Sequence, residues 1–366
     1  MNTKLISLIS LLILFSGLSA AVFGGISGAS EPTTITDGTG RSFEYTEPAE
    51  HIVTMGYAST LTVAMVGEIG KIIAVDTYST YSYTKDDRLK DLNAMDMGSI
   101  YTASNNDKIT TQFLQWVEDG TMSLHDTIVL TSYSNALVLR DQLNSYGFDH
   151  VLVYLSVTSY DQIVDFVRSM SIIATGDVSK IVNDMELVKT TIDEGLVGNT
   201  EKAQGLGVWY TTSTGEFSVG NSGSITVSLI EAAGGTNIAY NPSVTSTTYG
   251  NASTIIQLVE ANPDVVIFLP ANYLNSGKTV SDFRNTILGG DANVTILPVD
   301  ANWNNYDPDA ADGLWAFASA MYPDLFEGPT PQTDESSGSN LLLYAAAGIV
   351  VVIIILGAAY FMIMRP

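Results

Sequence analysis

Aromatic side chains recur where predicted strands end, and such side chains can bind a bulky ligand. Rings give a cleft a large contact area, and their OH and NH groups can orient a polar ligand. Any one ring has an alternative explanation as ordinary packing, but the recurrence in both halves of the chain indicates a binding site. A chelate or macrocycle fits this pattern better than a bare ion. The candidate ligand-binding residues are Tyr57, Tyr78, Tyr81, Tyr83, Tyr133, Trp209, Tyr210, Asn272, Tyr273, Trp303 and Tyr306.

The residues that catalysis would need are scarce. Cysteine is absent, which removes thiolate catalysis and cysteine-ligated metals. His51, His125 and His150 lack the spacing that one metal requires. The stretch SGKT at 276–279 imitates the end of a phosphate-binding loop, yet Asn272 stands where the first glycine belongs. We therefore predict no enzyme, no cofactor and no metal site. A hydrolase built from scattered Asp and Glu stays open as an alternative.

Short apolar runs alternate with helical patterns along most of the chain. Strands are expected at 51–55, 71–76, 127–133, 150–155, 205–212, 264–270 and 293–300. Helices are expected between them, at 59–66, 135–146, 224–233 and 253–260. This rhythm is typical of β-α-β units with parallel sheets. The open sheets place ligands at the carboxyl ends of their strands, which is where the aromatic residues stand.

A long helical region without a strand separates the two alternating halves. It runs from about Ser159 to Gly195, with a break near Gly176. The predicted fold is therefore α/β, with two Rossmann-like lobes joined by one long rigid helix. We assign 30–176 to the N-terminal lobe, 177–198 to the interlobe helix and 199–327 to the C-terminal lobe.

Both ends of the chain carry membrane-related signals. Lys4, an apolar run and small residues around Ala20 form the layout of a secretory signal peptide over 1–29. An uncleaved N-terminal anchor is the alternative. Residues 341–364 contain no charge and suffice to cross a membrane once, with Arg365 favouring a cytoplasmic end. Residues 328–340 are rich in Pro, Ser and Gly and predict a flexible stalk. The folded part is thus expected outside the cell membrane.

The net charge of −24 argues against one class of partner. A strongly acidic surface repels phosphate backbones, so nucleic acid is excluded as a partner. The same acidity suits solubility outside a cell.

Several stretches resemble the clamshell solute-binding proteins of ABC importers for iron-siderophore complexes, haem and cobalamin. They are DGTGRSFEYTEPAEHIVTMGYASTLTVAMVGEIGKIIAVDTYS at 37–79, SLIEAAGGTNIAYNP at 228–242, STIIQLVEANPDVVIFLP at 253–270 and AADGLWAFASAMYPDLF at 310–326. They follow the family's order over about 290 residues. The resemblance implies two lobes around a small-molecule chelate or macrocycle, with an ABC permease and its ATPase subunits as partners.

The resemblance also implies a contact with the transporter. In the family an acidic residue near Glu231 pairs with arginines of the membrane subunits, so we expect that role for Glu231. An ordinary solvated helix face is the alternative. The matching acid of the first lobe falls near Gln112, and this departure leaves that contact in doubt.

The sequence thus predicts a membrane-anchored receptor that captures an iron(III)-siderophore-type chelate or a corrinoid and delivers it to a permease. The alternative is a cell-surface binding or adhesion protein that is not coupled to transport.

Overall fold

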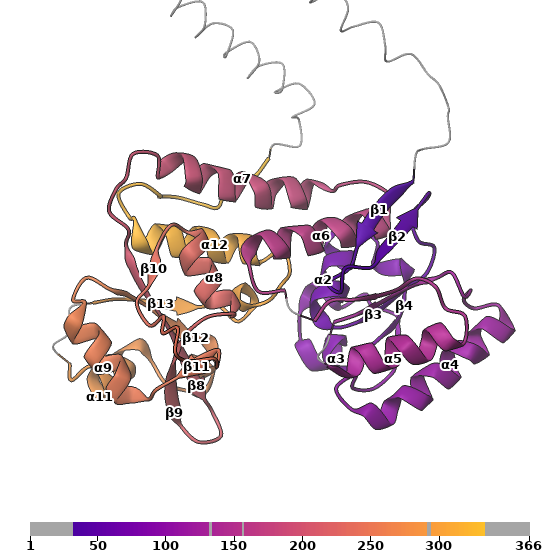
Figure 1. The fold of residues 1–366 in the computed structure, drawn as a ribbon, viewed down its shortest axis with the longest axis horizontal. Helices are drawn as coiled ribbons and strands as arrows, with labels where there is room; N and C mark the ends of the chain where they lie inside the picture. The colour runs from indigo at the N-terminus through magenta and orange to yellow at the C-terminus, as the bar shows by residue number, and fades with distance from the viewer. Residues whose placement is uncertain (1–31, 132–133, 156, 291–293, 334–366) are drawn as a thin grey trace, which may run out of the picture.

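Two α/β lobes lie side by side beneath one long helix in the computed structural model of the protein (Figure 1). The structure describes residues 32–131, 134–155, 157–290 and 294–333. Each lobe is built around its own sheet, and the long helix runs from the first lobe to the second. The two-lobe α/β fold predicted from the sequence is therefore present.

The first lobe contains a parallel sheet with the strand order β5-β4-β3-β6-β7. Its central strands read as unbroken apolar runs because both faces of a parallel sheet are covered. All residues of β3, β6 and β7 are accordingly buried. The strands are β3 (Ile52–Met55), β4 (Ile72–Val75), β5 (Met95–Asp96), β6 (Thr127–Leu130) and β7 (Val151–Val153), preceded by the hairpin β1 (Thr33–Thr36) and β2 (Ser42–Tyr45).

Helices and short helical turns connect the strands of this sheet. The helices are α2 (Tyr57–Met65), α3 (Tyr81–Thr84), α4 (Asn106–Asp119) and α5 (Ser134–Ser145). The 3-10 turns are η1 (Ile69–Lys71), η2 (Thr77–Ser79), η3 (Asp87–Leu89) and η4 (Ala103–Asn105). Between β4 and β5 the chain passes through η2, α3 and η3, which makes this the longest connection at the edge that faces the second lobe.

The second lobe has a mixed sheet, which differs from the parallel sheet expected. Strand β8 pairs in parallel with β12 and β10 but antiparallel with β9, and β9 pairs antiparallel with β11. A tight turn at Gly215, where φ is 73°, folds β9 back onto β8. The strands are β8 (Gln204–Thr211), β9 (Glu216–Gly220), β10 (Thr236–Asn237), β11 (Thr248–Tyr249), β12 (Val266–Pro270) and β13 (Thr295–Val299).

Three helices of the second lobe, α8, α9 and α11, begin at side-chain caps that the sequence supplies. Asn251 and Thr279 each form a capping box, and Ser224 caps its helix through its hydroxyl. The elements are α8 (Ile225–Ala232), α9 (Ala252–Ala261), α10 (Ala271–Asn275), α11 (Val280–Ile287), η5 (Asn302–Asn304) and α12 (Ala310–Met321).

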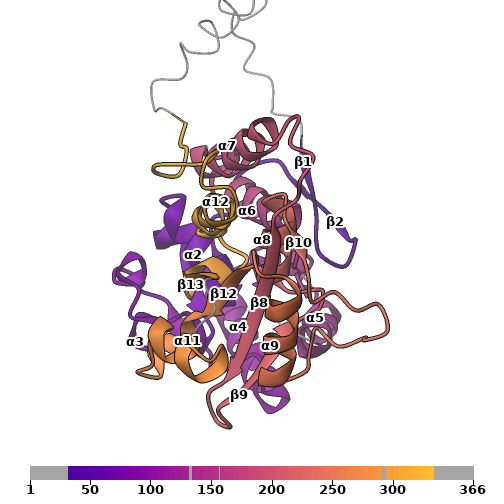
Figure 2. The same ribbon diagram turned by 90° about the vertical axis from the view of Figure 1, so that its left-hand side faces the viewer.

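Two consecutive helices form the back of the clamshell. Helix α6 (Tyr160–Thr175) starts at a capping box on Ser159 and ends at Gly176, whose φ of 82° only glycine adopts easily. Helix α7 (Lys180–Gly195) follows within the predicted interlobe segment 177–198 and crosses from one lobe to the other. In both views α7 lies along one side of the molecule, beside α6 and α12 (Figures 1 and 2).

A shared core makes this back rigid. The apolar stripe of α7, which consists of Val182, Met185, Val188 and Ile192, is buried against α6 and α12. One hydrophobic cluster continues from this stripe into both lobes and includes Ile52 of the first sheet and Phe268 of the second. Separate clusters fill the far side of each sheet. Relative motion of the lobes must therefore bend a packed core rather than a loose linker.

The predicted stalk begins against the body. Within 328–333, the carbonyl of Gly328 accepts a hydrogen bond from Trp315 Nε1 at 3.0 Å, and Thr333 N donates to Asp184 Oδ1 on α7 at 2.6 Å. These contacts attach the start of the segment to the body, and the flexibility of the stalk stays a prediction. The predicted signal peptide at 1–29, the rest of the stalk and the anchor at 341–364 lie outside the described residues. Among the residues that the structure does describe, no helix is long and apolar enough to cross a membrane.

Candidate ligand-binding cleft

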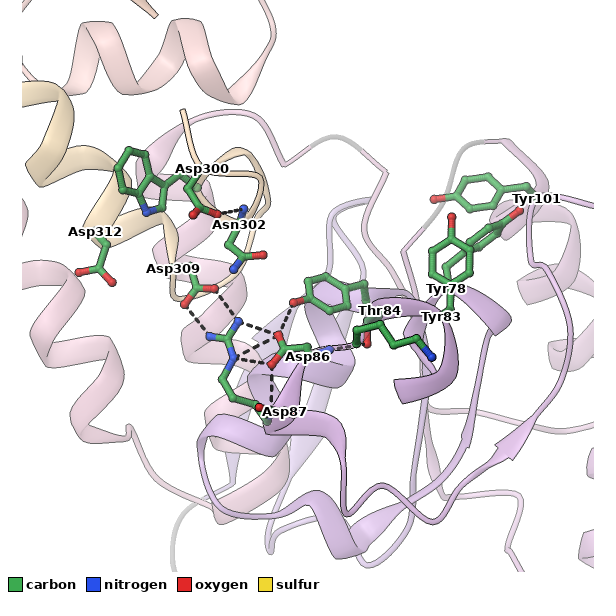
Figure 3. Close-up of a pocket in the computed structure, with 14 residues that line it drawn as sticks. Tyr78, Tyr83, Thr84, Asp86, Asp87, Tyr101, Asp300, Asn302, Asp309 and Asp312 are labelled. Carbon is green, nitrogen blue, oxygen red and sulfur yellow. Dashed lines mark hydrogen bonds and ion pairs between the residues drawn. The ribbon is translucent and has the colours of Figure 1, made fainter. Parts of the chain in front are cut away.

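A cavity of about 910 Å³ opens between the two lobes and is lined by both (Figure 3). The first lobe contributes Tyr57 at the start of α2 and the connection that runs from Tyr78 to Arg88. The second lobe contributes Asp300 after β13, Trp303 in η5, and acidic residues at the start of α12. Loops at the carboxyl edges of both sheets therefore meet here, which is where open α/β sheets place ligands.

Three tyrosines form one wall of this cavity. The ring centroids of Tyr78 and Tyr83 lie 5.1 Å apart, those of Tyr78 and Tyr101 lie 5.5 Å apart, and both pairs meet edge to face. The side chain of Tyr83 is 60% exposed and that of Tyr101 51%. Sequence reasoning missed Tyr101, because the preceding strand β5 has only two residues and leaves no apolar run to reveal it.

Buried Asp76 shapes the turn that carries this wall. It ends β4, its Oδ1 accepts a hydrogen bond from Ser79 Oγ, and its carbonyl accepts one from Ser79 N at 3.0 Å. Burial raises the pKa of Asp76 to about 6. The carboxyl group thus fixes the backbone on both sides of Tyr78, which presents the ring to the cavity.

An ion pair joins the lobes at the opposite wall. Arg88 donates to Asp309 Oδ1 at 2.7 Å and Oδ2 at 2.8 Å, and it also donates to Asp86 Oδ2 at 2.7 Å. Tyr57 OH donates to the same Asp86 Oδ2 at 2.6 Å. The hydrogen bonds from Arg88 lower the pKa of Asp86 to about 2. Bidentate pairing of this kind is geometrically specific, so Arg88 acts as a latch between the lobes.

Buried Asp307 lies beside this latch. Its side chain is 0% exposed, and its Oδ1 accepts a hydrogen bond from Asp309 N at 3.0 Å. Its Oδ2 has no hydrogen-bond partner in the described part of the chain. Burial, followed by the charge of Asp309, raises the pKa of Asp307 well above its usual range. The group therefore opposes folding wherever solution pH favours its ionised form.

Replacing Asp307 by Asn is expected to stabilise the protein at neutral pH. The raised pKa means that the penalty is absent below the unfolded value of about 4 and grows as pH rises above it. The Asp307→Asn variant should gain about 1 kcal/mol at pH 7 and nothing below about pH 4. Denaturant unfolding at both pH values measures this gain, with the exposed Asp324→Asn as control. A variant less stable than the wild type at pH 7 would contradict the assignment.

Two further cavities adjoin the cleft. One of about 270 Å³ is lined by Trp209, Tyr210 and Asn272, whose Nδ2 donates to the carbonyl of Tyr210 at 2.6 Å. Another of about 510 Å³ is lined by Trp209, Tyr306 and Tyr101, and so again receives residues from both lobes. Trp209 borders both spaces.

The structure gathers most of the predicted binding residues but not all. Tyr57, Tyr78, Tyr83 and Trp303 line the large cavity, while Trp209, Tyr210, Asn272 and Tyr306 line the adjoining ones. Tyr273 is 2% exposed and packs against Tyr210, Phe217 and Phe283, so it belongs to the core. Tyr81 is partly exposed and is not a lining residue of these cavities, although its OH donates at 3.3 Å to Oδ1 of Asp87, which lines the large one. Tyr133 lies outside the described residues.

The three histidines pair with nearby aspartates. Among the described residues, no group of three or more His, Cys, Asp or Glu side chains is arranged to hold a metal ion. His51 pairs with Asp126, and His125 and His150 both pair with Asp149. All three histidines flank strands at the edge away from the cleft, which agrees with a structural role.

Glu231 is exposed near the carboxyl end of α8. The amino end of that helix, at Ser224 and Ile225, lines the cleft. Gly234, one turn beyond Glu231, packs against Leu196 just after α7. Glu231 therefore lies toward the back of the clamshell rather than at the cleft. Its docking role stays a prediction.

Solved structures with a similar fold are known, although the sequence itself has no match. No known protein family and no curated protein matches the sequence. Among solved structures, the chain is similar to CeuE from Helicobacter pylori in a Ni-His complex, with 16% identity and a TM-score of 0.55 over 81% of this chain and 90% of that one.

Two further solved structures extend this likeness. A periplasmic binding protein from Veillonella parvula has 12% identity and a TM-score of 0.53, over 82% of this chain and 95% of that one. A protein of an ABC-type Fe3+-hydroxamate transport system from Saccharomonospora viridis has 14% identity and a TM-score of 0.50, over 80% and 99%. The chain thus has the two-lobe fold of periplasmic binding proteins, as its sequence stretches suggested.

Proposed function

We propose that this protein is the extracytoplasmic substrate-binding component of an ABC importer and carries an iron(III)-siderophore-type chelate or a corrinoid. The observation that carries the proposal is the cavity of about 910 Å³, which both lobes line with aromatic rings. Its size suits a drug-sized or larger organic ligand rather than a bare ion. The fold shared with periplasmic binding proteins supports binding rather than catalysis.

The proposed cycle uses the latch between the lobes. Ligand enters between the tyrosine wall and Trp303, and closure over it keeps Arg88 of the first lobe in contact with Asp309 of the second. Because the shared core under α7 resists large movements, closure is a small bending of the lobes. The closed receptor then meets the permease, and a separate ATPase drives import. In this scheme the predicted segment 341–364 anchors the receptor to the membrane.

Ligand titration tests the proposal directly. Trp209 and Trp303 line the cavities, so their fluorescence should change when ferric siderophores, haem or cobalamin bind. Failure of all three ligand types to bind would refute the assignment and favour a surface protein that is not coupled to transport.

A matched pair of variants locates the site. Tyr83 and Tyr240 are both 60% exposed, but only Tyr83 lines the large cavity. Tyr83→Ala is expected to weaken binding about fivefold, since one aromatic contact contributes about 1 kcal/mol. Tyr240→Ala should leave the dissociation constant unchanged. Equal effects of the two substitutions would place the ligand elsewhere.

The docking role of Glu231 has its own test. Glu231→Arg is expected to reduce ligand uptake in cells about tenfold, because it places like charges opposite the permease arginines, while ligand affinity stays intact. Glu216→Arg changes another exposed glutamate of the same lobe and serves as the control. Unchanged uptake in Glu231→Arg would refute the docking role of Glu231.

A further inference from the structure

We propose that the ligand of this cleft carries a net positive charge, an inference that rests on the proposed function and narrows its substrate class. The observation is the charge of the cavity wall. Five of its fourteen lining residues are aspartates, and the only cations among those fourteen are Lys85 and Arg88. The five are Asp86, Asp87, Asp300, Asp309 and Asp312.

Arg88 cannot serve as an anion receptor in this arrangement. Its Nη1 and Nη2 both bond Asp309, and Nη2 and Nε bond Asp86. Every nitrogen of the guanidinium therefore already faces a carboxylate. An anionic ligand would have to break the latch between the lobes in order to reach this charge, so closure and anion binding oppose each other.

Lys85 does not reverse the balance. Its Nζ lies 5.8 Å from the ring centroid of Tyr81, and Tyr81 is not among the residues that line the large cavity. As a single flexible ammonium it offsets at most one of the aspartates.

The second lobe presents two carboxylates that pair with no cation in the described part of the chain. Asp300 and Asp312 are exposed, and neither forms an ion pair with any described residue. Both line the same cavity as Trp303, and Figure 3 shows Asp300 and Asp312 on the side of the cavity that the second lobe forms. An aromatic face between carboxylates is a favourable site for an ammonium or another cation. The tyrosine wall opposite offers further ring faces.

The electrostatic field of the whole protein also favours a cationic ligand. A net charge of −24 raises the local concentration of cations and lowers that of anions, and a cleft concentrates this effect. The cleft is therefore expected to select cationic chelates over neutral ones, and neutral ones over anionic chelates such as ferric tricatecholates.

A matched ligand series tests the charge without changing the shape of the metal centre. The probes are ferric complexes of one linear trihydroxamate whose terminal amine is free, acetylated or succinylated, which gives one positive, no net and one negative charge. Aquacobalamin, cyanocobalamin and a cyanocobalamin monocarboxylic acid provide a corresponding corrinoid series. Dissociation constants of the full chain are measured at low and high salt. We expect affinity to fall about threefold to tenfold at each charge step at low salt, and less at high salt.

Variants test whether the aspartates of the cavity wall cause this order of affinities. The double variant Asp300→Asn and Asp312→Asn should reduce the discrimination between the cationic and anionic probes about tenfold. The double variant Asp264→Asn and Asp324→Asn removes the same charge from exposed positions outside the cavity and should leave the discrimination nearly unchanged. Thermal unfolding checks that both variants fold.

The outcomes separate the two proposals. An anionic probe that binds as tightly as its cationic counterpart, or an order that the Asp300 and Asp312 variant leaves intact, overturns the charge inference while the importer proposal stands. Absence of binding by every probe of these series, and by haem as well, overturns both.

Discussion

Gly56→Ala is expected to destabilise the protein by about 3 kcal/mol or more, because the site has no room for a Cβ atom. A Cβ at residue 56 would lie 1.4 Å from Thr131 Oγ1 and 2.8 Å from Thr131 Cβ. Thr131 cannot withdraw, since it is 1% exposed and both its N and its Oγ1 donate to the carbonyl of Met55 at 3.1 Å. The substitution must therefore separate the carboxyl ends of β3 and β6.

The same clash should displace part of the binding site. Gly56 is the residue before α2, and Tyr57 follows it into the cavity wall. Denaturant unfolding of the full chain measures the loss. The control is Gly70→Ala, where a Cβ meets nothing within 4 Å and φ is not positive, and it should change stability by less than about 0.5 kcal/mol. A loss below about 1 kcal/mol in Gly56→Ala would show that the strand ends can yield.

Arg88→Gln is expected to open the clamshell at neutral pH. Removing the guanidinium leaves Asp86 and Asp309 facing each other beside buried Asp307, and like charges then push the lobes apart. The latch is partly solvent-exposed, with 34% of the Arg88 side chain accessible, so we expect a loss of about 2 kcal/mol rather than the larger cost of a fully buried pair. Small-angle scattering should record a larger radius of gyration, and unfolding should record the loss of stability.

An arginine that pairs within one lobe provides the control for this variant. Arg140 pairs with the exposed Asp141 within the first lobe, so Arg140→Gln should leave the radius of gyration unchanged. If Arg88→Gln had the dimensions and stability of the wild type at neutral pH, the ion pair of Arg88 with Asp309 would not hold the lobes together.

Acid should weaken the latch in the wild-type protein. The folded-state pKa of Asp86 is lowered to about 2, below its unfolded value near 4. The stabilising contribution of Asp86 is therefore complete above about pH 4 and is lost as pH falls toward 2. Arg88→Gln should lack this component of the pH dependence, which separates the latch from general acid unfolding.

The aromatic residues illustrate how far sequence reasoning reaches. Strand ends were predictable, because buried parallel strands form unbroken apolar runs, and so Tyr57, Tyr78, Tyr83 and Trp303 were found before the structure placed them around one cavity. Residue type alone could not separate Tyr83 from Tyr273. Both follow strands, but Tyr273 turns inward because α10 begins directly at Pro270 and brings the ring against Tyr210 and Phe283.

The charged residues were less accessible to prediction. Asp86, Arg88, Asp307 and Asp309 stand in loops with no periodic pattern, and two of them are separated from the others by more than two hundred residues. Only the packing of the two lobes brings these four side chains together. Strand β9 was likewise hidden, since its pairing with β8 depends on a turn at Gly215 rather than on an apolar run.

By itself, the sequence determined the alternation of strands and helices, the break at Gly176 and the aromatic character of the strand ends, because each of these is set by neighbours along the chain. The tertiary structure decided which rings meet ligand space, the acidity of the cavity, and the latch of Arg88 with Asp309 across the lobes. These properties depend on distances between segments remote in sequence, and side-chain burial and charge pairing exist only once those segments have packed.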